Sequence, residues 1–269
     1  MDKKKITSVR RRVWNHYRAH GRHDLPWRTT KNPYRILVSE IMLQQTQVSR
    51  VIPKYKEFIQ QFPTVKALAN ATSREVLTLW QGLGYNRRAL ALHRAARIVH
   101  DKHNGRMPRT YEALLALPGI GPYTAGAVCA FAYNKAVPLV ETNVRTVLFH
   151  HVLSNRAKVS DSEMLSMSKQ LMDTKRPREW YWALMDYGAY LKAEGVRTNH
   201  RSKHYTKQSK FAGSDREVRG ALVRTLTNGS HTQRQLQAKV KAAPERIRTQ
   251  LARLHQEGLV QRNRGRWSL

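Results

Sequence analysis

Residues 117–127 read LPGIGPYTAGA and lie between two apolar stretches, YEALLAL (111–117) and TAGAVCAFAY (124–133). Both stretches have helical composition, so the sequence predicts two helices joined by a turn with two glycines one residue apart. Glycine reaches positive φ without steric penalty and lets another backbone approach closely. The amide N–H groups at the start of the second helix would then be available to an anion. We therefore expect a helical hairpin that grips phosphate.

The net charge of the chain indicates which class of phosphate-containing molecule it binds. The 269 residues include 49 Lys and Arg against 18 Asp and Glu, a formal net charge of +31. This excess is spread along the chain and favours a polyanion, most simply nucleic acid. An anionic membrane surface is the competing partner, but no apolar run approaches the roughly 18 residues of a spanning helix. The length allows one large domain or two smaller ones, and we expect two.

The chain has one cysteine, Cys129, so it can form neither an intramolecular disulfide nor a multi-cysteine metal site. Within AGAVCAFAY this residue is expected to be small, apolar and buried. The basic N-terminus is followed by no hydrophobic segment of a secretory signal, so a cytoplasmic protein is expected, nucleoid-associated if bacterial.

A candidate catalytic carboxylate lies in residues 34–48, YRILVSEIMLQQTQV. Glu40 falls inside an apolar run, where desolvation penalises the ionised form. If the helix continues, Gln44 and Gln47 share a face with Glu40, because they follow at i+4 and i+7. Taken alone, this pattern also fits a helix with an exposed polar stripe.

A second carboxylate, Glu141, falls between the apolar run VPLV and the expected helix VRTVLFHHVL. A helix N-terminus would keep it ionised, although an N-terminal helix acid without function is the simpler local interpretation. One desolvated and one ionised carboxylate together form the arrangement that divides acid and ion-stabilising roles at a glycosidic centre.

The remaining pattern predicts an all-α class, since almost nothing before residue 190 alternates with period two. Helices are expected at 5–20, from Asn32-Pro33 onward, from Pro53 to Phe62, after the Thr72 capping box, and at 87–102.

Several motifs occur in the order and spacing of the helix-hairpin-helix DNA glycosylases. They are LPWRTTKNPYRILVSEIMLQQTQVSRVIPKY (25–55), WQGLGYNRRA (80–89), LPGIGPYTAGA (117–127), VETNVRTV (140–147) and LMDYGAYL (184–191). The string SEIMLQQTQV resembles the adenine DNA glycosylases of the MutY type. This resemblance covers about residues 8–192 and implies a two-lobed all-α fold that binds a nucleotide flipped out of double-stranded DNA.

The resemblance also implies roles for individual residues. Glu40 would protonate the purine leaving group, Glu141 stands where the family has an aspartate that stabilises the sugar cation, and Asn143 would support the attacking water. The predicted DNA contacts are Gly119, Gly121 and Thr124 in the hairpin, Gln44 and Gln45 near the vacated base, and Tyr85 in a stacking wedge. For Gln44, Gln45 and Tyr85 a purely structural role is the alternative.

Three departures from the family pattern affect these expectations. Tyr123 is counted with the catalytic residues, but it stands where bifunctional members carry a Schiff-base lysine, so we expect base excision without strand cleavage. Glu141 is one methylene longer than the usual aspartate, which leaves room for a slower enzyme or a pocket for another base. The four cysteines of the family fall, in simple register, on Lys192, Asn199, Ser202 and Gln208. No [4Fe-4S] cluster is expected, and the basic segment 195–210 is expected to contact DNA directly.

The C-terminal residues predict a separate module. A helix at 215–227, a capping box at Thr232, a helix from Pro244 and a hairpin around Asn263-Arg264-Gly265 resemble a winged helix. Its basic residues, which include Arg246, Arg248 and Arg264, are expected to contact the DNA backbone; a solvated face or a protein-docking module is the alternative. No sequence resembles the separate domain with which many members recognise 8-oxoguanine. The resulting division is 1–191 glycosylase domain, 192–213 basic linker and 214–269 winged-helix-like domain.

The sequence thus predicts a monomeric, monofunctional DNA glycosylase that removes a mispaired base, most simply adenine opposite guanine or 8-oxoguanine. One alternative is removal of uracil or thymine opposite guanine. The other is a catalytically weak protein that binds lesions.

Overall fold

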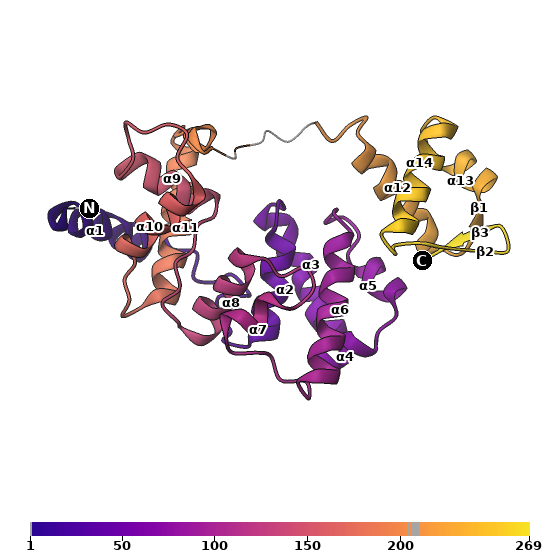
Figure 1. The fold of residues 1–269 in the computed structure, drawn as a ribbon, viewed down its shortest axis with the longest axis horizontal. Coiled ribbons are helices and arrows are strands. Elements are labelled where there is room, and N and C mark those ends of the chain that lie inside the picture. Colours follow the sequence, from indigo (N-terminus) through magenta and orange to yellow (C-terminus); the bar gives the residue numbers. More distant parts are fainter. Residues whose placement is uncertain (1, 204, 206–209) are drawn as a thin grey trace. The chain divides into compact units, whose positions relative to one another are not determined.

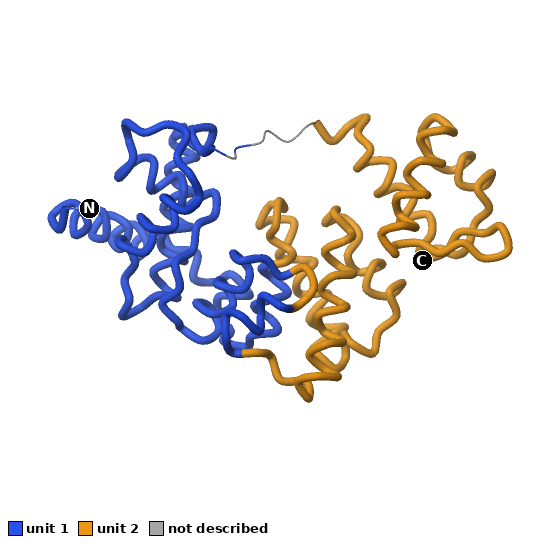
Figure 2. The backbone as a smooth tube through the Cα atoms, viewed as in Figure 1, with its two compact units in different colours: residues 1–40, 109–116, 120–207 blue, residues 41–108, 117–119, 208–269 orange. Residues whose placement is uncertain are grey.

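The structure is a computed structural model that describes residues 2–203, 205 and 210–269. The chain forms two compact units, each assembled from segments that are far apart in sequence (Figure 2). Unit 1 takes residues 1–40, 109–116 and 120–207, and unit 2 takes residues 41–108, 117–119 and 208–269. The predicted division into three successive segments stays a prediction.

Unit 1 is built from helices around an aromatic and aliphatic core that includes the fully buried Trp180 and Tyr181. Its elements are the first part of α2 (Pro33–Leu43) together with α1 (Lys3–His20), α7 (Tyr111–Leu115), α8 (Pro122–Tyr133), α9 (Thr142–His151), α10 (Asp161–Leu171), α11 (Pro177–Ala193) and the 3-10 helix η1 (Asn199–Arg201). The most extensive helix–helix packing in this unit is between α9 and α11 (Figure 1). A Cβ on Gly188 of α11 would lie 2.3 Å from the carbonyl oxygen of Asn143, so only glycine allows this approach.

A buried ion pair ties the segment between α1 and α2 to α11. The two terminal nitrogens of the Arg28 guanidinium donate to the carboxylate of Asp186, at 2.6 and 2.9 Å. The side chains of Arg28 and Asp186 are 4% and 2% exposed. The backbone N–H of Arg22 donates to the same carboxylate at 2.9 Å. Burial alone would raise the pKa of Asp186, but the hydrogen bonds and charge of Arg28 outweigh it and hold that pKa below its ordinary value.

The helix that carries Glu40 ends earlier than the sequence predicted. Asn32 caps its start, because its side-chain oxygen accepts from the N–H groups of Tyr34 and Arg35. The helix stops at Leu43, and Gln45 takes a left-handed backbone with φ of 54°. The predicted face shared by Glu40, Gln44 and Gln47 is therefore wrong.

The physical reason for this early end is the guanidinium of Arg88. It donates to the carbonyl oxygens of Ile41, Met42 and Gln44, at 2.8, 3.1 and 2.5 Å. These carbonyls lose their helical partners where the chain turns, and a cation there satisfies them. Burial lowers the pKa of Arg88 to about 10, so the guanidinium stays charged at neutral pH.

Unit 2 contains the helices between α2 and residue 108 together with the C-terminal elements. They are α3 (Val48–Gln61), α4 (Val65–Asn70), α5 (Ser73–Leu79), α6 (Arg87–Lys102), α12 (Asp215–Thr227), β1 (His231–Thr232), α13 (Gln233–Lys239), α14 (Pro244–Gln256), β2 (Gln261–Asn263) and β3 (Arg266–Ser268). The prediction that a helix starts at Pro53 is wrong, because α3 begins at Val48 and holds Pro53 inside it. Pro53 is the sixth residue of α3, so the helix lacks the backbone hydrogen bond that residue 53 would otherwise donate to residue 49.

The C-terminal helices and strands form a small module within unit 2 (Figure 1). The predicted helix at 215–227 and the capping box from Thr232 to Gln235 are both present. The predicted hairpin is present as β2 and β3, with Arg264 and Gly265 at φ of 45° and 76°, and the two-residue strand β1 joins it in the order β1-β3-β2. The winged-helix interpretation of this module stays a prediction.

The predicted all-α class is confirmed, since helices dominate the described residues and strands occur only in the C-terminal module. Cys129 is fully buried, as predicted. No helix of the described part of the chain is both long and apolar enough to cross a membrane.

Replacing Arg28 tests the buried ion pair. In Arg28→Met the Asp186 carboxylate stays buried with only Arg22 as its cation, so the free energy of unfolding should fall by about 3–5 kcal/mol. Arg22→Met is the matched control, because the side chain of Arg22 is 38% exposed and should contribute about 1 kcal/mol or less. Urea denaturation of both variants checks this, and equal losses would contradict the assignment.

Candidate active site

Glu40 is the most strongly perturbed carboxyl group of the site. Its side chain lies at the buried end of α2, and the residue is 6% exposed. Burial raises the pKa of Glu40 to about 7, with repulsion from Glu141 acting in the same direction. A hydrogen bond from Tyr123 and the charge of Arg28 oppose this shift only in part. A substantial fraction of Glu40 is therefore protonated at neutral pH and can donate that proton.

Tyr123 comes from the first turn of α8 and holds the carboxyl group in place. Its hydroxyl donates to one oxygen of Glu40 at 3.1 Å, which leaves the other oxygen for a ligand. Burial and the neighbouring carboxyl groups raise the pKa of Tyr123 well above its ordinary value, so the phenol remains a donor.

Glu141 is the N-cap of α9. One carboxylate oxygen accepts from the backbone N–H groups of Asn143 and Val144, both at 2.8 Å. The other oxygen accepts from the side chains of Asn143 and Thr142, at 3.1 and 3.2 Å. All four contacts donate to the carboxylate, and the start of a helix favours negative charge.

Unit 1 therefore brings together all four predicted catalytic residues: Glu40, Tyr123, Glu141 and Asn143. It also adds Lys192, whose ammonium donates to the side-chain oxygen of Asn143 at 2.8 Å. From the sequence, Lys192 was predicted only as a position where the family has a cysteine. A lysine four residues after the glycine of LMDYGAY was the available signal, since i and i+4 share a helix face.

Two of the other cysteine positions of the family also contact α9. Asn199 donates to the carbonyl oxygen of Thr142 at 3.2 Å, and the hydroxyl of Ser202 accepts from Arg145 at 3.1 Å. Gln208 lies outside the described residues. No group of three or more His, Cys, Asp or Glu side chains in the described ranges is placed to hold a metal ion.

The hairpin glycines have different structural requirements. Gly119 has φ of 74°, and a Cβ there would lie 2.4 Å from the Cβ of Ala91, so the fold itself requires glycine. Gly121, the N-cap of α8, has φ of −89°, and a Cβ there would meet no atom of the protein within 4 Å. Its open surroundings leave room for an external group at the helix N-terminus. Thr124 is 2% exposed, and its predicted contact with DNA stays a prediction.

Gln44, Gln45 and Tyr85 lie in unit 2 on two turns that share one cation. Arg88 donates to Gln44 in the first turn and to the carbonyl oxygens of Leu83 and Gly84 in the second, at 3.2 and 3.1 Å. Tyr85 has φ of 48° and is 39% exposed, which presents an aromatic ring to solvent. Arg88 sets the backbone of both turns and was not predicted from the sequence.

The predicted DNA contacts of the C-terminal module have different surroundings. Arg246 donates to Asp215 and to the carbonyl oxygen of Gly213, at 2.8 and 2.7 Å, and so fixes the start of α12. Arg248 pairs with Glu245 on the surface of α14 at 3.2 Å. Arg264 is exposed at the hairpin turn. On this geometry Arg248 and Arg264 are better placed than Arg246 to meet an external anion.

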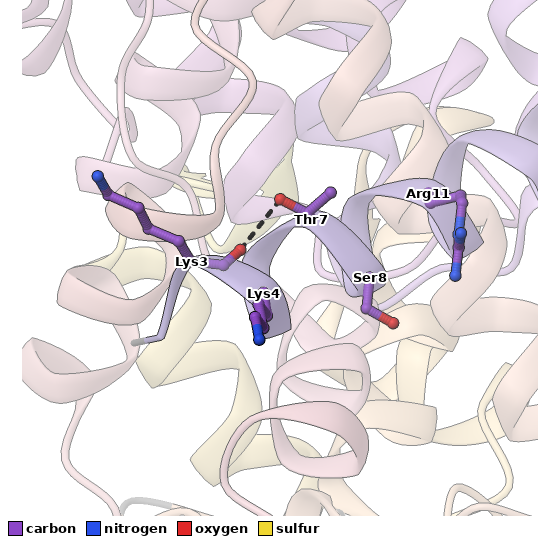
Figure 3. A pocket seen from close by; sticks show the side chains of 5 residues that line it. All are labelled: Lys3, Lys4, Thr7, Ser8 and Arg11. Atoms are coloured by element: carbon purple, nitrogen blue, oxygen red, sulfur yellow. Dashed lines mark hydrogen bonds between the residues drawn. The ribbon is translucent and has the colours of Figure 1, made fainter.

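A hollow of about 380 Å³ lies along the exposed side of α1 (Figure 3). Its lining comes from one helix and consists of Lys3, Lys4, Thr7, Ser8 and Arg11. It contains no carboxyl group and is a space between surface side chains.

Comparisons with known proteins identify the family of this site. Residues 38–173 match the family described as HhH-GPD superfamily base excision DNA repair protein. Over 271 residues the chain is 38% identical to an adenine DNA glycosylase of Mycolicibacterium smegmatis, with 93% of this chain and 92% of that protein covered. The chain belongs to the HhH-GPD superfamily. The resemblance inferred from the motifs is thereby confirmed.

Two further HhH-GPD comparisons define the range of the similarity. An adenine DNA glycosylase of Buchnera aphidicola subsp. Acyrthosiphon pisum is 42% identical over 182 residues, which cover 66% of this chain but only 52% of that protein. A solved thermostable thymine-DNA glycosylase matches with a TM-score of 0.64 and 27% identity, over 75% of this chain and 97% of that one. The chain thus spans nearly all of the Mycolicibacterium protein and about half of the Buchnera one.

The raised pKa of Glu40 predicts that this residue destabilises the fold. In the folded protein the pKa of Glu40 is about 7, above its ordinary value of 4.5. The folded state therefore holds this proton more tightly than the unfolded state. The free energy of unfolding is highest below pH 4.5 and decreases as the pH rises through 7. Glu40→Gln removes the ionisation but keeps an acceptor for Tyr123. It should raise the free energy of unfolding at pH 8 by up to about 3 kcal/mol and leave it unchanged near pH 4.

Denaturation of Glu40→Gln at the two pH values measures this effect. Glu112→Gln, which changes an exposed carboxyl group on α7, controls for the loss of one negative charge. A Glu40 variant that is no more stable than the control at pH 8 would contradict the buried, proton-retaining carboxyl.

Proposed function

We propose that this protein is an adenine DNA glycosylase that hydrolyses the bond between adenine and deoxyribose, acting opposite guanine or 8-oxoguanine. The observation that carries the proposal is a buried carboxyl with a pKa of about 7, held by Tyr123 and accompanied by the carboxylate that caps α9. Identity of 38% to the Mycolicibacterium adenine DNA glycosylase over almost the whole chain supports the choice of base.

Glu40 is proposed as the general acid. Adenine is a poor leaving group as an anion, but protonation of a ring nitrogen lets it depart as a neutral base. The C1′–N9 bond then breaks with its electron pair going to the base. A carboxyl group whose pKa is close to the working pH is well suited to this transfer.

Glu141 and Asn143 are proposed to act on the sugar. Loss of the base leaves positive charge on the sugar ring, and a fixed carboxylate near that charge lowers the barrier. Water then bonds to C1′ and passes a proton to a carboxylate. The helix cap fixes Glu141 before the reaction begins, so little reorganisation is needed.

The DNA is proposed to be held mainly through its backbone. The open N-terminus of α8 at Gly121 suits a phosphate, and a net charge of +31 supplies the long-range attraction. Gln44, Gln45 and Tyr85 are proposed to occupy the duplex where the base has left. In a bacterium such a substrate places the protein at the cytoplasmic nucleoid.

We further propose that the enzyme acts without a [4Fe-4S] cluster and without strand cleavage. One cysteine in the whole chain falls short of the four thiolates that such a cluster uses. Tyr123 has a phenol, which cannot form an imine with the sugar.

One observation favours a second candidate function. The chain is 27% identical to a thermostable thymine-DNA glycosylase, and that structure superposes with a TM-score of 0.64. The side chain of Glu141 is one methylene longer than an aspartate, which extends the reach of the carboxylate by about 1.5 Å, and a displacement of this size affects how a site fits its substrate. Excision of thymine or uracil opposite guanine is therefore the alternative.

Single-turnover excision on a panel of duplexes tests the proposal. With A:8-oxoG, A:G, T:G and U:G substrates, the adenine duplexes should be processed fastest. Glu40→Gln should lower the rate constant by about 100-fold or more, because the proton donor is lost. Alkali after the reaction should be needed to cut the strand.

The other outcomes are distinct. Faster excision from T:G or U:G than from the adenine duplexes would contradict adenine as the substrate and support thymine or uracil instead. Tight binding with no excision from any duplex would indicate a protein that only binds lesions. A covalent adduct trapped with borohydride would contradict the monofunctional assignment.

A further inference from the structure

Lys192 ends a line of three side chains that leads to the carboxylate capping α9. Its ammonium donates to the side-chain oxygen of Asn143 at 2.8 Å, and the side-chain nitrogen of Asn143 donates to Glu141 at 3.1 Å. Lys192 lies in the last turn of α11, and Asn143 lies in the first turn of α9.

The direction of these hydrogen bonds is set by the lysine. An asparagine side chain offers an acceptor on one side and donors on the other, whereas an ammonium group only donates. Lys192 therefore fixes the amide of Asn143 with its oxygen toward α11 and its nitrogen toward Glu141. The donor that Glu141 needs is thus oriented from outside α9.

The position of the charge also matters for the sugar cation. Lys192 contacts the amide oxygen, and the carboxylate of Glu141 is the next group along the line. A direct ion pair would offset the negative charge that Glu141 is proposed to present to the sugar. Because Asn143 lies between them, Lys192 orients the carboxylate of Glu141 without forming a direct ion pair with it. Burial lowers the pKa of Lys192, and attraction by Glu141 opposes that effect.

The close packing of the α9 and α11 backbones brings Lys192 and Asn143 together. Gly188 lies one turn before Lys192 on α11, and its missing Cβ lets that helix approach the backbone of Asn143. Residues four apart share a helix face, so the same close approach brings the lysine to the asparagine side chain.

We propose that Lys192 is a positioning residue for base excision, acting through Asn143 to orient Glu141. This inference rests on the proposed glycosylase activity. It gives this lysine a task in the reaction that is independent of contact with DNA.

Lys192→Met tests the proposal, because it keeps the length of the side chain and removes the donor. The single-turnover rate constant should fall by about 10- to 100-fold, since a misplacement of about 1 Å in the site has effects of that order. Lys192→Arg, which retains a charged donor, should recover most of the rate. Lys169→Met, which removes one exposed positive charge from α10, is the control for weaker DNA binding.

Three measurements separate positioning from a structural role. The dissociation constant for an adenine-containing duplex in Lys192→Met should match that of Lys169→Met. The melting temperature should remain high enough for the protein to be folded in the assay. In a double-mutant cycle, Lys192→Met should add almost nothing to the loss caused by Asn143→Ala.

The proposal would be overturned if Lys192→Met excised at the wild-type rate, if weaker binding accounted for its whole loss, or if its effect were additive with Asn143→Ala. A borohydride-trapped DNA adduct that forms with the wild type and is lost in Lys192→Met would make the lysine a nucleophile instead. A wild type that excises no base from any duplex would refute the proposed function, which is a separate failure.

Discussion

Exclusion of water from Glu40 is the constraint on which the rest of the site depends. A carboxyl that is 6% exposed would ionise at a cost, so its pKa rises to about 7 and it keeps a proton at a pH where most acids have lost theirs. Tyr123 fixes the orientation of the group, and the charge of Arg28 limits the rise of its pKa. Arg28 is itself held by Asp186, so the ion pair that joins α11 to the segment before α2 also bears on the acid.

Glu141 has the opposite environment within the same unit. Two backbone N–H groups and two side-chain donors contact its carboxylate, and a helix begins beneath it. The two acids therefore differ because Glu40 is buried and accepts one hydrogen bond, from Tyr123, whereas Glu141 accepts four. Such a division of environments is what glycosidic chemistry requires of a pair of carboxyl groups.

Local signals in the sequence located the helices well, and long-range contacts explain what it missed. The helices at 87–102 and 215–227 were predicted to the residue from composition and flanking residues, although no side chain caps the N-terminus of either helix. The expected continuation of α2 beyond Leu43 was wrong, because Arg88, far along the chain, supplies the donors that stop the helix. The strand β1 is only two residues long and has no period to detect. The motifs pointed to Glu40 and Glu141, whereas the contact between Lys192 and Asn143 depends on how α9 and α11 pack.

The pH dependence of excision tests the central claim most directly, namely that Glu40 acts as a proton donor because it is buried. The single-turnover rate constant should be constant at low pH and should fall as the pH rises through about 7. Tyr123→Phe removes a hydrogen bond that lowers the pKa of Glu40, so its midpoint should move to higher pH. A profile with its midpoint near the ordinary glutamate value of 4.5, or one that does not respond to Tyr123→Phe, would contradict this account.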